Sequence, residues 1–205
     1  MDPQVQAKDI RSIGIIGAIA SGKSTVSKWL AMRGWVVVDA DQEVHRLYGS
    51  GQILVEPIVA RFGAGILRAD GAIDRVALGR EVFGDPQKLK DLEAITHPAA
   101  RAAIQHRMEH LRKAGGKAVL EMALLHRWSE MLGALDLVVG VFVPDEARIQ
   151  RLMQRNNLEE ADARKRVELQ SQDQLLAPSQ LVLDNSGDLA ALYRNLEEWL
   201  GPLVG

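Results

Sequence analysis

Residues 17–24, Gly-Ala-Ile-Ala-Ser-Gly-Lys-Ser, combine small residues, a lysine and a hydroxyl in the spacing G-x-x-x-x-G-K-[ST]. A loop of this pattern turns its backbone N–H groups inward around a hollow of the size of an anion. The helix that follows adds the positive end of its dipole. The spacing predicts a phosphate-binding loop, in which Lys23 reaches the outer phosphates and the Ser24 hydroxyl ligates Mg²⁺.

Two simpler interpretations of this segment compete with the phosphate loop. It could be a turn of small residues with a surface lysine, or Ala18-Ile19-Ala20 could be the cleavage site of a signal peptide. The residues before it include Asp2 and Asp9, so they do not form the positive segment with which a signal peptide begins. An apolar run before the loop and a helical pattern after it favour the phosphate loop.

Two carboxylates follow the next apolar run, "WVVVDAD" at 35–41. If Asp39 and Asp41 both end a strand, they share a face, because side chains two apart in a strand do. The carboxyl ends of parallel strands form the ligand-binding edge of a sheet. Asp41 would then accept a proton from an attacking hydroxyl near the phosphate loop. Alternatively, Asp41 caps the helix predicted after it, and the two roles can coexist.

The segment "KAVLEMALL" at 117–125 returns to a strand, and Glu121 is expected at the end of that strand. At the same edge of the sheet, this carboxylate could hold a water on Mg²⁺. The alternative is a charge at a strand end without a function.

Arg148, Arg151 and Arg155 have the spacing i, i+3, i+7, which places them on one helical face, with apolar residues on the other. A polar, arginine-rich segment follows. An arginine-lined flap over ATP would stabilise charge on a phosphoryl group in transfer. The alternative is a solvated, charge-paired helix, since acidic residues at 159–162 are close by.

The composition bounds the class of protein. The chain has 205 residues, 47% apolar and 25% charged, which suffices for one domain with a core or for a core with an inserted subdomain. A net charge of −2 gives no global field for nucleic acid or an anionic membrane. The chain has no cysteine, which excludes disulfides and thiolate metal sites and is compatible with a reducing compartment. No apolar run approaches the ~20 residues of a membrane span.

The elements that must position these residues alternate along the chain. Strands are predicted at 12–17, 35–41, 117–125, 135–143 and 181–187, with a helix at 24–33 and a terminal helix ending at Leu200. Residues 44–114 are mostly helical, with breaks at 62–71 and 84–88. Apolar strands separated by helices predict an α/β fold with a parallel sheet covered on both faces. The long helical stretch is too large for a simple crossover and is interpreted as an inserted subdomain.

A phosphate loop alone does not name a reaction, because GTPase switches, ATPase motors and kinases share it. A switch needs an N-K-x-D element to read guanine, and the sequence contains none. The D-x-x-G match at 184–187 follows the last predicted strand, so it is interpreted as coincidental.

Beyond these motifs, the chain resembles the dephospho-coenzyme A kinase family over nearly its whole length. The resemblance rests on the phosphate loop, "DAD" at 39–41, the stretch 62–99 that ends in His97-Pro98, "ALL" at 123–125, "EARIQRLMQR" at 146–155, "EADARKRVELQ" at 160–170 and "LDNSG" at 183–187. The stretch 62–99 is the most specific of these.

The resemblance implies a P-loop fold like that of nucleoside monophosphate kinases, with five parallel strands. It implies a single kinase domain, 1–205, with a nucleotide-binding core at 11–43 and 116–205, a helical acceptor subdomain at 44–115 and a lid at 146–176. The implied reaction is the ATP-dependent phosphorylation of the ribose 3′-hydroxyl of dephospho-coenzyme A, with Mg²⁺ as cofactor. The implied substrates are ATP and dephospho-coenzyme A, and the implied location is the cytoplasm, with no nucleic acid or membrane partner and no indication of oligomeric state.

Together, the residue patterns and the resemblance give the expected site. The expected catalytic residues are Lys23, Asp41, Arg151 and Arg155. Expected to bind ATP are Gly17, Ala18, Ile19, Ala20, Ser21, Gly22, Lys23, Ser24, Thr25, Arg148 and Asn185. Expected to bind the acceptor are Asp39, Asp41, Arg75, His97 and Leu124. Mg²⁺ is expected to be bound by Ser24 directly and by Glu121 through a water molecule. Taken alone, His97 could also be an ordinary helix-end histidine capped by Pro98.

The sequence departs from the family pattern at several positions. Ile16 replaces a threonine, and Ala18 and Ala20 replace glycines, so a glycine-only backbone angle at 18 or 20 would be strained. Ala123, Arg127 and Ser179-Gln180 also differ from the family. Two alternatives therefore stay open: a kinase for another nucleoside or nucleotide, and a member that binds nucleotide or coenzyme A without turnover.

Overall fold

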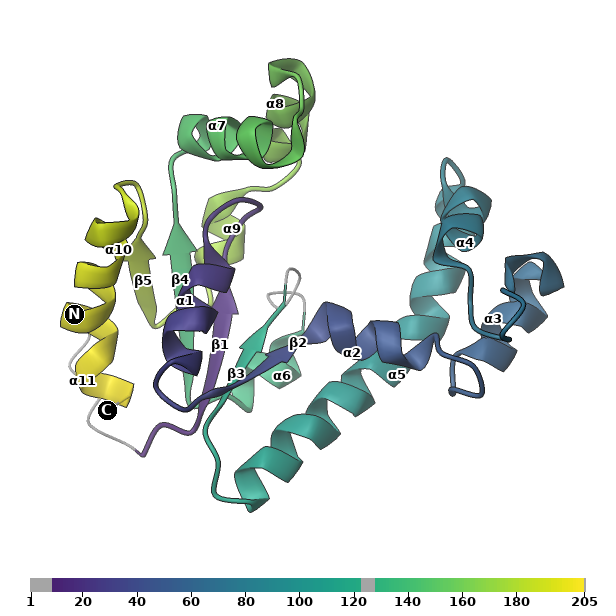
Figure 1. Cartoon of the computed structure of the whole chain (residues 1–205), viewed down its shortest axis with the longest axis horizontal. Coiled ribbons are helices and arrows are strands. Elements are labelled where there is room, and N and C mark those ends of the chain that lie inside the picture. The colour runs from purple at the N-terminus through teal and green to yellow at the C-terminus, as the bar shows by residue number, and fades with distance from the viewer. Residues whose placement is uncertain (1–8, 123–127, 205) are drawn as a thin grey trace. The chain divides into compact units, whose positions relative to one another are not determined.

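A sheet of five parallel strands forms the centre of the fold in the computed structural model, which describes residues 9–122 and 128–204 (Figure 1). Its strands are β1 (Ser12–Ile16), β2 (Val36–Asp39), β3 (Ala118–Glu121), β4 (Leu137–Phe142) and β5 (Leu181–Asp184), in the order β2-β3-β1-β4-β5. Ile15 of β1 pairs with Glu121 of β3 and Val139 of β4. The expected parallel α/β architecture is confirmed.

Helices connect the strands and begin at recognisable caps. They are α1 (Lys23–Ala31), α2 (Ala40–Leu47), α3 (Val55–Phe62), α4 (Arg75–Val82), α5 (Pro86–Lys113), α6 (Ser129–Gly133), α7 (Asp145–Asn156), α8 (Glu160–Glu168), α9 (Gln172–Leu176), α10 (Leu189–Asn195) and α11 (Gly201–Val204), with a 3₁₀ turn at Ala64–Ile66 and a π-helical turn at Leu196–Leu200. Asp39, Asp74 and Asp188 accept backbone N–H bonds at the starts of α2, α4 and α10. These bonds satisfy donors that a helix start leaves free.

The main core lies between one face of the sheet and the helices α1, α10 and α11. It buries alternate strand residues such as Ile13, Ile15 and Val139 against Trp29 and Leu30 of α1. The alternation follows from the two-residue period of a strand. All five residues of β1 are buried, as expected for a strand covered on both faces.

Contacts divide the chain into two compact units: residues up to Val38 together with those from His110 onward, and residues 39–109. The second unit has its own apolar cluster around the buried residues Leu54, Ile58, Ile66, Ile73 and Leu78. The functional limits expected from the sequence, 11–43, 44–115 and 116–205, stay predictions.

One local prediction and two of the alternative interpretations were wrong. The second strand ends at Asp39, so Asp41 lies in the first turn of α2, and Asp39 rather than Asp41 caps that helix. His97 does not end a helix, because α5 continues through Pro98 to Lys113. A proline removes one hydrogen bond from a helix, and burial of Thr96 and Ala100 on either side of it keeps α5 packed.

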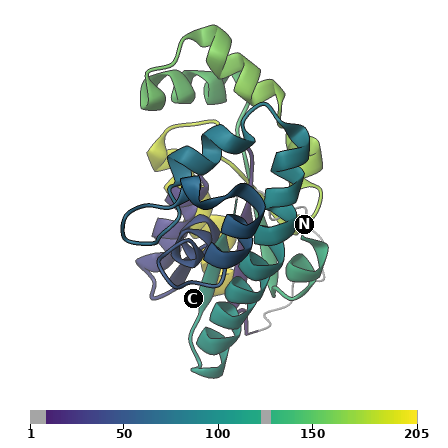
Figure 2. The ribbon, with the colours of Figure 1, turned by 90° about the vertical axis from the view of Figure 1, so that its right-hand side faces the viewer.

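Figures 1 and 2 show α7 and α8 as neighbouring helices, and Figure 1 places them beyond the arrowheads of the strands. The buried residues Ile149, Leu152, Ala163 and Val167 join them. Among the helices that the structure describes, none combines the length and the apolar character that crossing a bilayer requires.

Candidate functional site

The predicted phosphate loop lies between the end of β1 and the start of α1, as the pattern requires. Two of its glycines are fixed by close approach. A Cβ on Gly17 would lie 2.8 Å from the Val141 carbonyl oxygen, and one on Gly22, where φ is +99°, would collide with the Asn185 side-chain amide. A larger residue would have to displace the backbone of β4 at position 17 and the Asn185 side chain at position 22.

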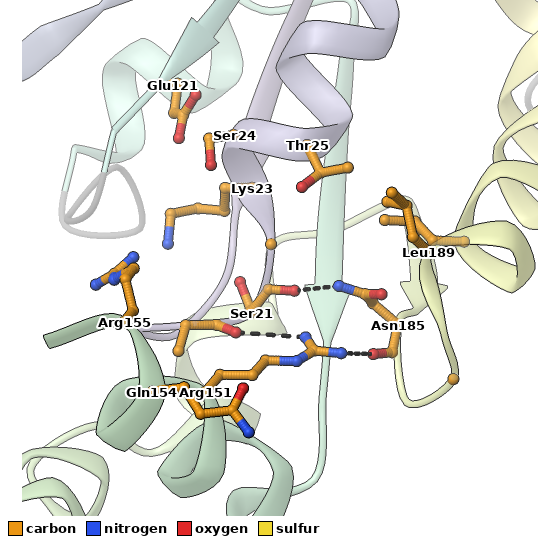
Figure 3. A pocket seen from close by; sticks show the side chains of 14 residues that line it. Ser21, Lys23, Ser24, Thr25, Glu121, Arg151, Gln154, Arg155, Asn185 and Leu189 are labelled. Atoms are coloured by element: carbon orange, nitrogen blue, oxygen red, sulfur yellow. Dashed lines mark hydrogen bonds between the residues drawn. The ribbon is translucent and has the colours of Figure 1, made fainter. Parts of the chain in front are cut away.

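Two side chains from other elements hold the loop in place (Figure 3). The buried Asn185 amide Nδ2 donates to the Ser21 carbonyl at 2.7 Å. Arg151, from α7, donates from Nη2 to the Asn185 carbonyl at 2.8 Å and from Nη1 to the Ala20 carbonyl at 3.4 Å. The guanidinium therefore links the phosphate loop to the turn that follows β5.

A cavity of about 560 Å³ opens against this loop. It is lined by Ala20, Ser21, Gly22, Lys23, Ser24, Thr25, Glu121, Arg151, Gln154, Arg155, Asn185, Gly187, Leu189 and Leu192. Three of these side chains are cationic and one is a carboxylate, and apolar residues lie at the far end near α10. A polyphosphate with an apolar or aromatic body is the kind of ligand that this lining suits.

Lys23 points from the start of α1 into the region between Ser24 and Arg155 in Figure 3. Its Nζ donates to the carbonyls of Gly17 and Ala18 at 2.9 and 3.1 Å. The ammonium thus spans the loop while it borders the cavity. A phosphate in the cavity would meet a charge that the loop already holds in position.

The oxygen donors expected for Mg²⁺ line the same cavity. The Ser24 hydroxyl and the Glu121 carboxylate both point into it (Figure 3). No group of three or more His, Cys, Asp or Glu side chains gathers in the part of the chain that the structure describes. One hydroxyl and one carboxylate fit Mg²⁺, since this ion retains water and binds substrate phosphates rather than a full protein cage.

The three arginines of α7 have different environments. Arg151 and Arg155 line the cavity, whereas Arg148 is fully buried and outside its lining. Arg148 Nη2 donates to the Asp145 carboxylate at 2.7 Å. Two of the three arginines therefore lie beside the phosphate loop. A contact between Arg148 and nucleotide stays a prediction.

A second cavity, of about 420 Å³, lies in the unit 39–109. Its lining includes Asp41 and His45 of α2, Tyr48 at the C-cap of that helix, and Arg75 of α4. Burial raises the pKa of Tyr48, and the positive charge of Arg75 acts in the opposite direction. The lining thus joins Asp41 to Arg75, two of the residues predicted to face an acceptor.

The other predicted acceptor residues fall elsewhere. Asp39 is occupied as the cap of α2, where Oδ1 accepts from the N–H groups of Asp41 and Gln42 at 2.9 and 3.2 Å. His97 is half-buried in the middle of α5 and outside the lining of the second cavity. Leu124 lies outside the described residues.

One of the two alanines that replace family glycines has an unfavourable backbone. Ala20 has φ +61°, in the left-handed region, whereas Ala18 is not among the residues with positive φ. An L-residue in that region is disfavoured by about 1 kcal/mol or more. The strain expected at position 20 is confirmed, and none is found at position 18.

We expect Ala20→Gly to raise the free energy of unfolding by about 1 kcal/mol, because glycine adopts a positive φ without steric cost. For a chain of this length, that corresponds to a rise in melting temperature of about 2–4 °C. Ala18→Gly is the matched control. It should lower the melting temperature, since Ala18 is fully buried and unstrained. Thermal melts of both variants test this, and an Ala20→Gly protein that melts at or below the parent temperature would contradict it.

Several lining residues escaped sequence analysis. Gln154 borders the first cavity one turn from Arg151, and His45 and Tyr48 border the second. A helical wheel of α7 could have found Gln154, because a residue three positions after Arg151 lies on the same side of the helix. His45 and Tyr48 follow Asp41 by four and seven residues, which places the three on one side of a helix. The sequence predicts a strand through Asp41, so it does not group these residues.

Comparison with known proteins decides which kind of phosphate-loop protein has this site. The family model described as dephospho-CoA kinase matches residues 11–191. The chain belongs to the dephospho-CoA kinase family. Among the relatives, the dephospho-CoA kinase of Geobacter sulfurreducens is 42% identical over 187 residues, covering 91% of this chain and 95% of the relative.

Solved structures agree with this kinase family. The dephospho-CoA kinase structure from Campylobacter jejuni has a TM-score of 0.67 and 26% identity, and the match covers 94% of this chain and 97% of that one. A shikimate kinase from Acinetobacter baumannii, 16% identical, matches with a TM-score of 0.50 over 96% of both chains. This second likeness shows that the fold is that of small P-loop kinases.

Proposed function

We propose that this kinase transfers the γ-phosphoryl group of ATP to the ribose 3′-hydroxyl of dephospho-coenzyme A, giving ADP and coenzyme A. Family membership carries the choice of acceptor. The observation that carries the chemistry is the cavity in which Lys23, Arg151 and Arg155 border a phosphate loop. In such a site, positioning and charge stabilisation supply most of the catalysis.

The nucleotide would bind in the first cavity. The loop N–H groups and Lys23 would hold the phosphates, and Leu189, Leu192 and Thr25 would face the remainder of the nucleotide. Arg155 would add charge near the transferring group. Mg²⁺, held by Ser24 and through water by Glu121, would supply neutralisation of the phosphate charge when bound.

The acceptor would bind through the second unit. Arg75 in the lining of the second cavity provides a cation for the anionic groups of dephospho-coenzyme A. Asp41, exposed in the same lining, would orient the hydroxyl and take its proton as the new O–P bond forms and the bond to the ADP oxygen breaks. The location in the cytoplasm stays a prediction.

The test is a product assay on the full chain. The protein is incubated with Mg²⁺ and ATP together with dephospho-coenzyme A, adenosine or shikimate in separate reactions, and products are separated and identified by mass. We expect one added phosphoryl group on dephospho-coenzyme A alone, with the product co-eluting with authentic coenzyme A. Phosphorylation of adenosine instead would support a nucleoside kinase. Tight ATP binding without any product would support a binding protein.

The cavity arginines should affect turnover rather than acceptor binding. We expect Arg151→Ala and Arg155→Ala each to lower kcat by about tenfold or more, with KM for the acceptor little changed, because their charges act on the phosphoryl group. Steady-state kinetics with each substrate varied measures this. The control is Arg164→Ala on α8, whose side chain pairs with Glu146 and Glu160 at the surface. Exposed pairs of this kind contribute about 0–1 kcal/mol, so kcat should be retained. If all three variants turned over alike, α7 would be only a charged surface helix.

A further inference from the structure

One hydrogen bond joins the phosphate loop to Gln170, which lies directly after Leu169, the C-cap of α8. The Ile19 N–H donates to Oε1 of Gln170 at 2.6 Å, although 151 positions separate the two residues. Gln170 lies in the bend between α8 and α9, and its own N–H donates to the Val167 carbonyl at 3.1 Å. The backbone of Gln170 is therefore bonded to the end of α8, and the side chain of Gln170 is bonded to the phosphate loop.

Apolar packing acts on the same part of the loop. Ile19 and Ala20 pack against the cluster that joins α7 to α8, formed by Ile149, Leu152, Ala163 and Val167. The Ala20 carbonyl also accepts from Arg151 of α7. Two hydrogen bonds therefore hold the first half of the phosphate loop, one from the Ile19 N–H to Gln170 and one from Arg151 to the Ala20 carbonyl. Packing of Ile19 and Ala20 against the cluster between α7 and α8 adds to them.

The anchoring coincides with the strained residue. Ala20, directly after Ile19, has φ +61°. An L-residue leaves the left-handed region unless its surroundings hold it there. The next residues, Ser21 to Ser24, line the cavity, so a change of backbone at Ala20 would move the groups that face the phosphates.

We propose that Gln170 is a positioning residue for nucleotide binding. Its side-chain oxygen holds the Ile19 N–H and thereby keeps Ala20 in the left-handed conformation that the phosphate loop needs. Gln170 is not in the lining of the cavity, so it acts through Ile19 and Ala20 rather than on the nucleotide. The proposal deepens the proposed function and rests on it for the identity of the nucleotide as ATP.

A glycine at position 20 should change the effect of losing Gln170. If Gln170 works against backbone strain, removing the strain should make it dispensable, because glycine populates the left-handed region about as readily as the right-handed one. If Gln170 only stabilised α8 and α9, a glycine at position 20 would not compensate for its loss. The two roles are separated by a double-mutant cycle between positions 20 and 170.

The experiment uses four full-length proteins: the parent chain, Gln170→Leu, Ala20→Gly and the double variant. The dissociation constant for ATP is measured by titration, and KM for ATP and for dephospho-coenzyme A by steady-state kinetics. We expect Gln170→Leu to weaken ATP binding by about tenfold, the order that follows from losing one well-placed hydrogen bond, while KM for the acceptor stays within about twofold. Ala20→Gly added to Gln170→Leu should restore ATP binding to within about threefold of the parent.

Two further measurements keep the test specific. Gln174→Leu changes an exposed glutamine of α9 and should leave ATP binding unchanged. Hydrogen exchange at the Ile19 amide should become at least about tenfold faster in Gln170→Leu, because the amide has lost its acceptor. Should Gln170→Leu fold poorly, Gln170→Met gives the same comparison with a side chain of matched length.

Three results would overturn the proposal: unchanged ATP binding in Gln170→Leu and Gln170→Met, no restoration by Ala20→Gly, or an equal loss in Gln174→Leu. The proposed function can fail separately. If the parent binds ATP and Gln170→Leu weakens that binding, but no variant phosphorylates dephospho-coenzyme A, the role of Gln170 stands and the proposed acceptor is wrong. If the parent forms coenzyme A and Gln170→Leu binds ATP as tightly as the parent does, the proposed function stands and the proposed role of Gln170 is wrong.

Discussion

Lys23→Met should lower kcat by about 10²-fold to 10³-fold, because a charge that faces the transferring phosphoryl group is removed from a preorganised site. Lys23 starts α1 and borders the cavity, and its Nζ is already fixed by the carbonyls of Gly17 and Ala18. A charge held in place before the reaction needs no reorganisation during it, which is why such contacts have large effects on rate. Methionine keeps most of the side-chain stem and removes the ammonium.

The measurement is kcat and kcat/KM with ATP and dephospho-coenzyme A, together with a thermal melt. Lys28→Met serves as the matched control, since Lys28 is an exposed lysine of the same helix and outside the cavity lining. It should turn over at the parent rate. A Lys23→Met protein that melts normally and retains the parent kcat would show that this loop does not act on the phosphoryl group.

The parts of the site that sequence predicted are those fixed by local pattern. The phosphate loop needs only residues contiguous in the chain, and its glycines are required by contacts at Gly17 and Gly22. The strain at Ala20 was predictable from the resemblance instead, because the family has a glycine at that position. The strands were predictable because continuous apolar runs such as β1 and β4 are buried on both faces.

What sequence could not predict depends on junctions and long-range contacts. The run "WVVVDAD" looks like one strand, but α2 begins at Ala40 without a spacer, so the cap falls on Asp39. Pro98 looks like a helix end, but burial of Thr96 and Ala100 carries α5 through it. The contact between Gln170 and Ile19 joins residues 151 positions apart, and no periodicity reports it.

The second large effect is expected at Asp41, which lies in the first turn of α2. Asp41→Asn should lower kcat by about 10²-fold or more, because asparagine can still occupy the space but cannot take the proton of the acceptor hydroxyl. In a loose transition state, orientation of the hydroxyl accounts for part of this effect. The melting temperature should change little. Asp41 is exposed in the first turn of α2, and its interaction with the helix dipole contributes about 0.3–1 kcal/mol.

Two controls separate catalysis from helix capping. Glu56→Gln changes an exposed carboxylate in the first turn of α3, which has the same relation to a helix dipole, and should leave kcat unchanged. Asp39→Ala removes the cap of α2 and should lower the free energy of unfolding by about 1 kcal/mol. Because Asp39 carries the capping bonds, a loss of rate in Asp41→Asn without a loss of stability cannot come from the cap. If Asp41→Asn melted early but kept its rate per folded molecule, Asp41 would support α2 and take no part in proton transfer.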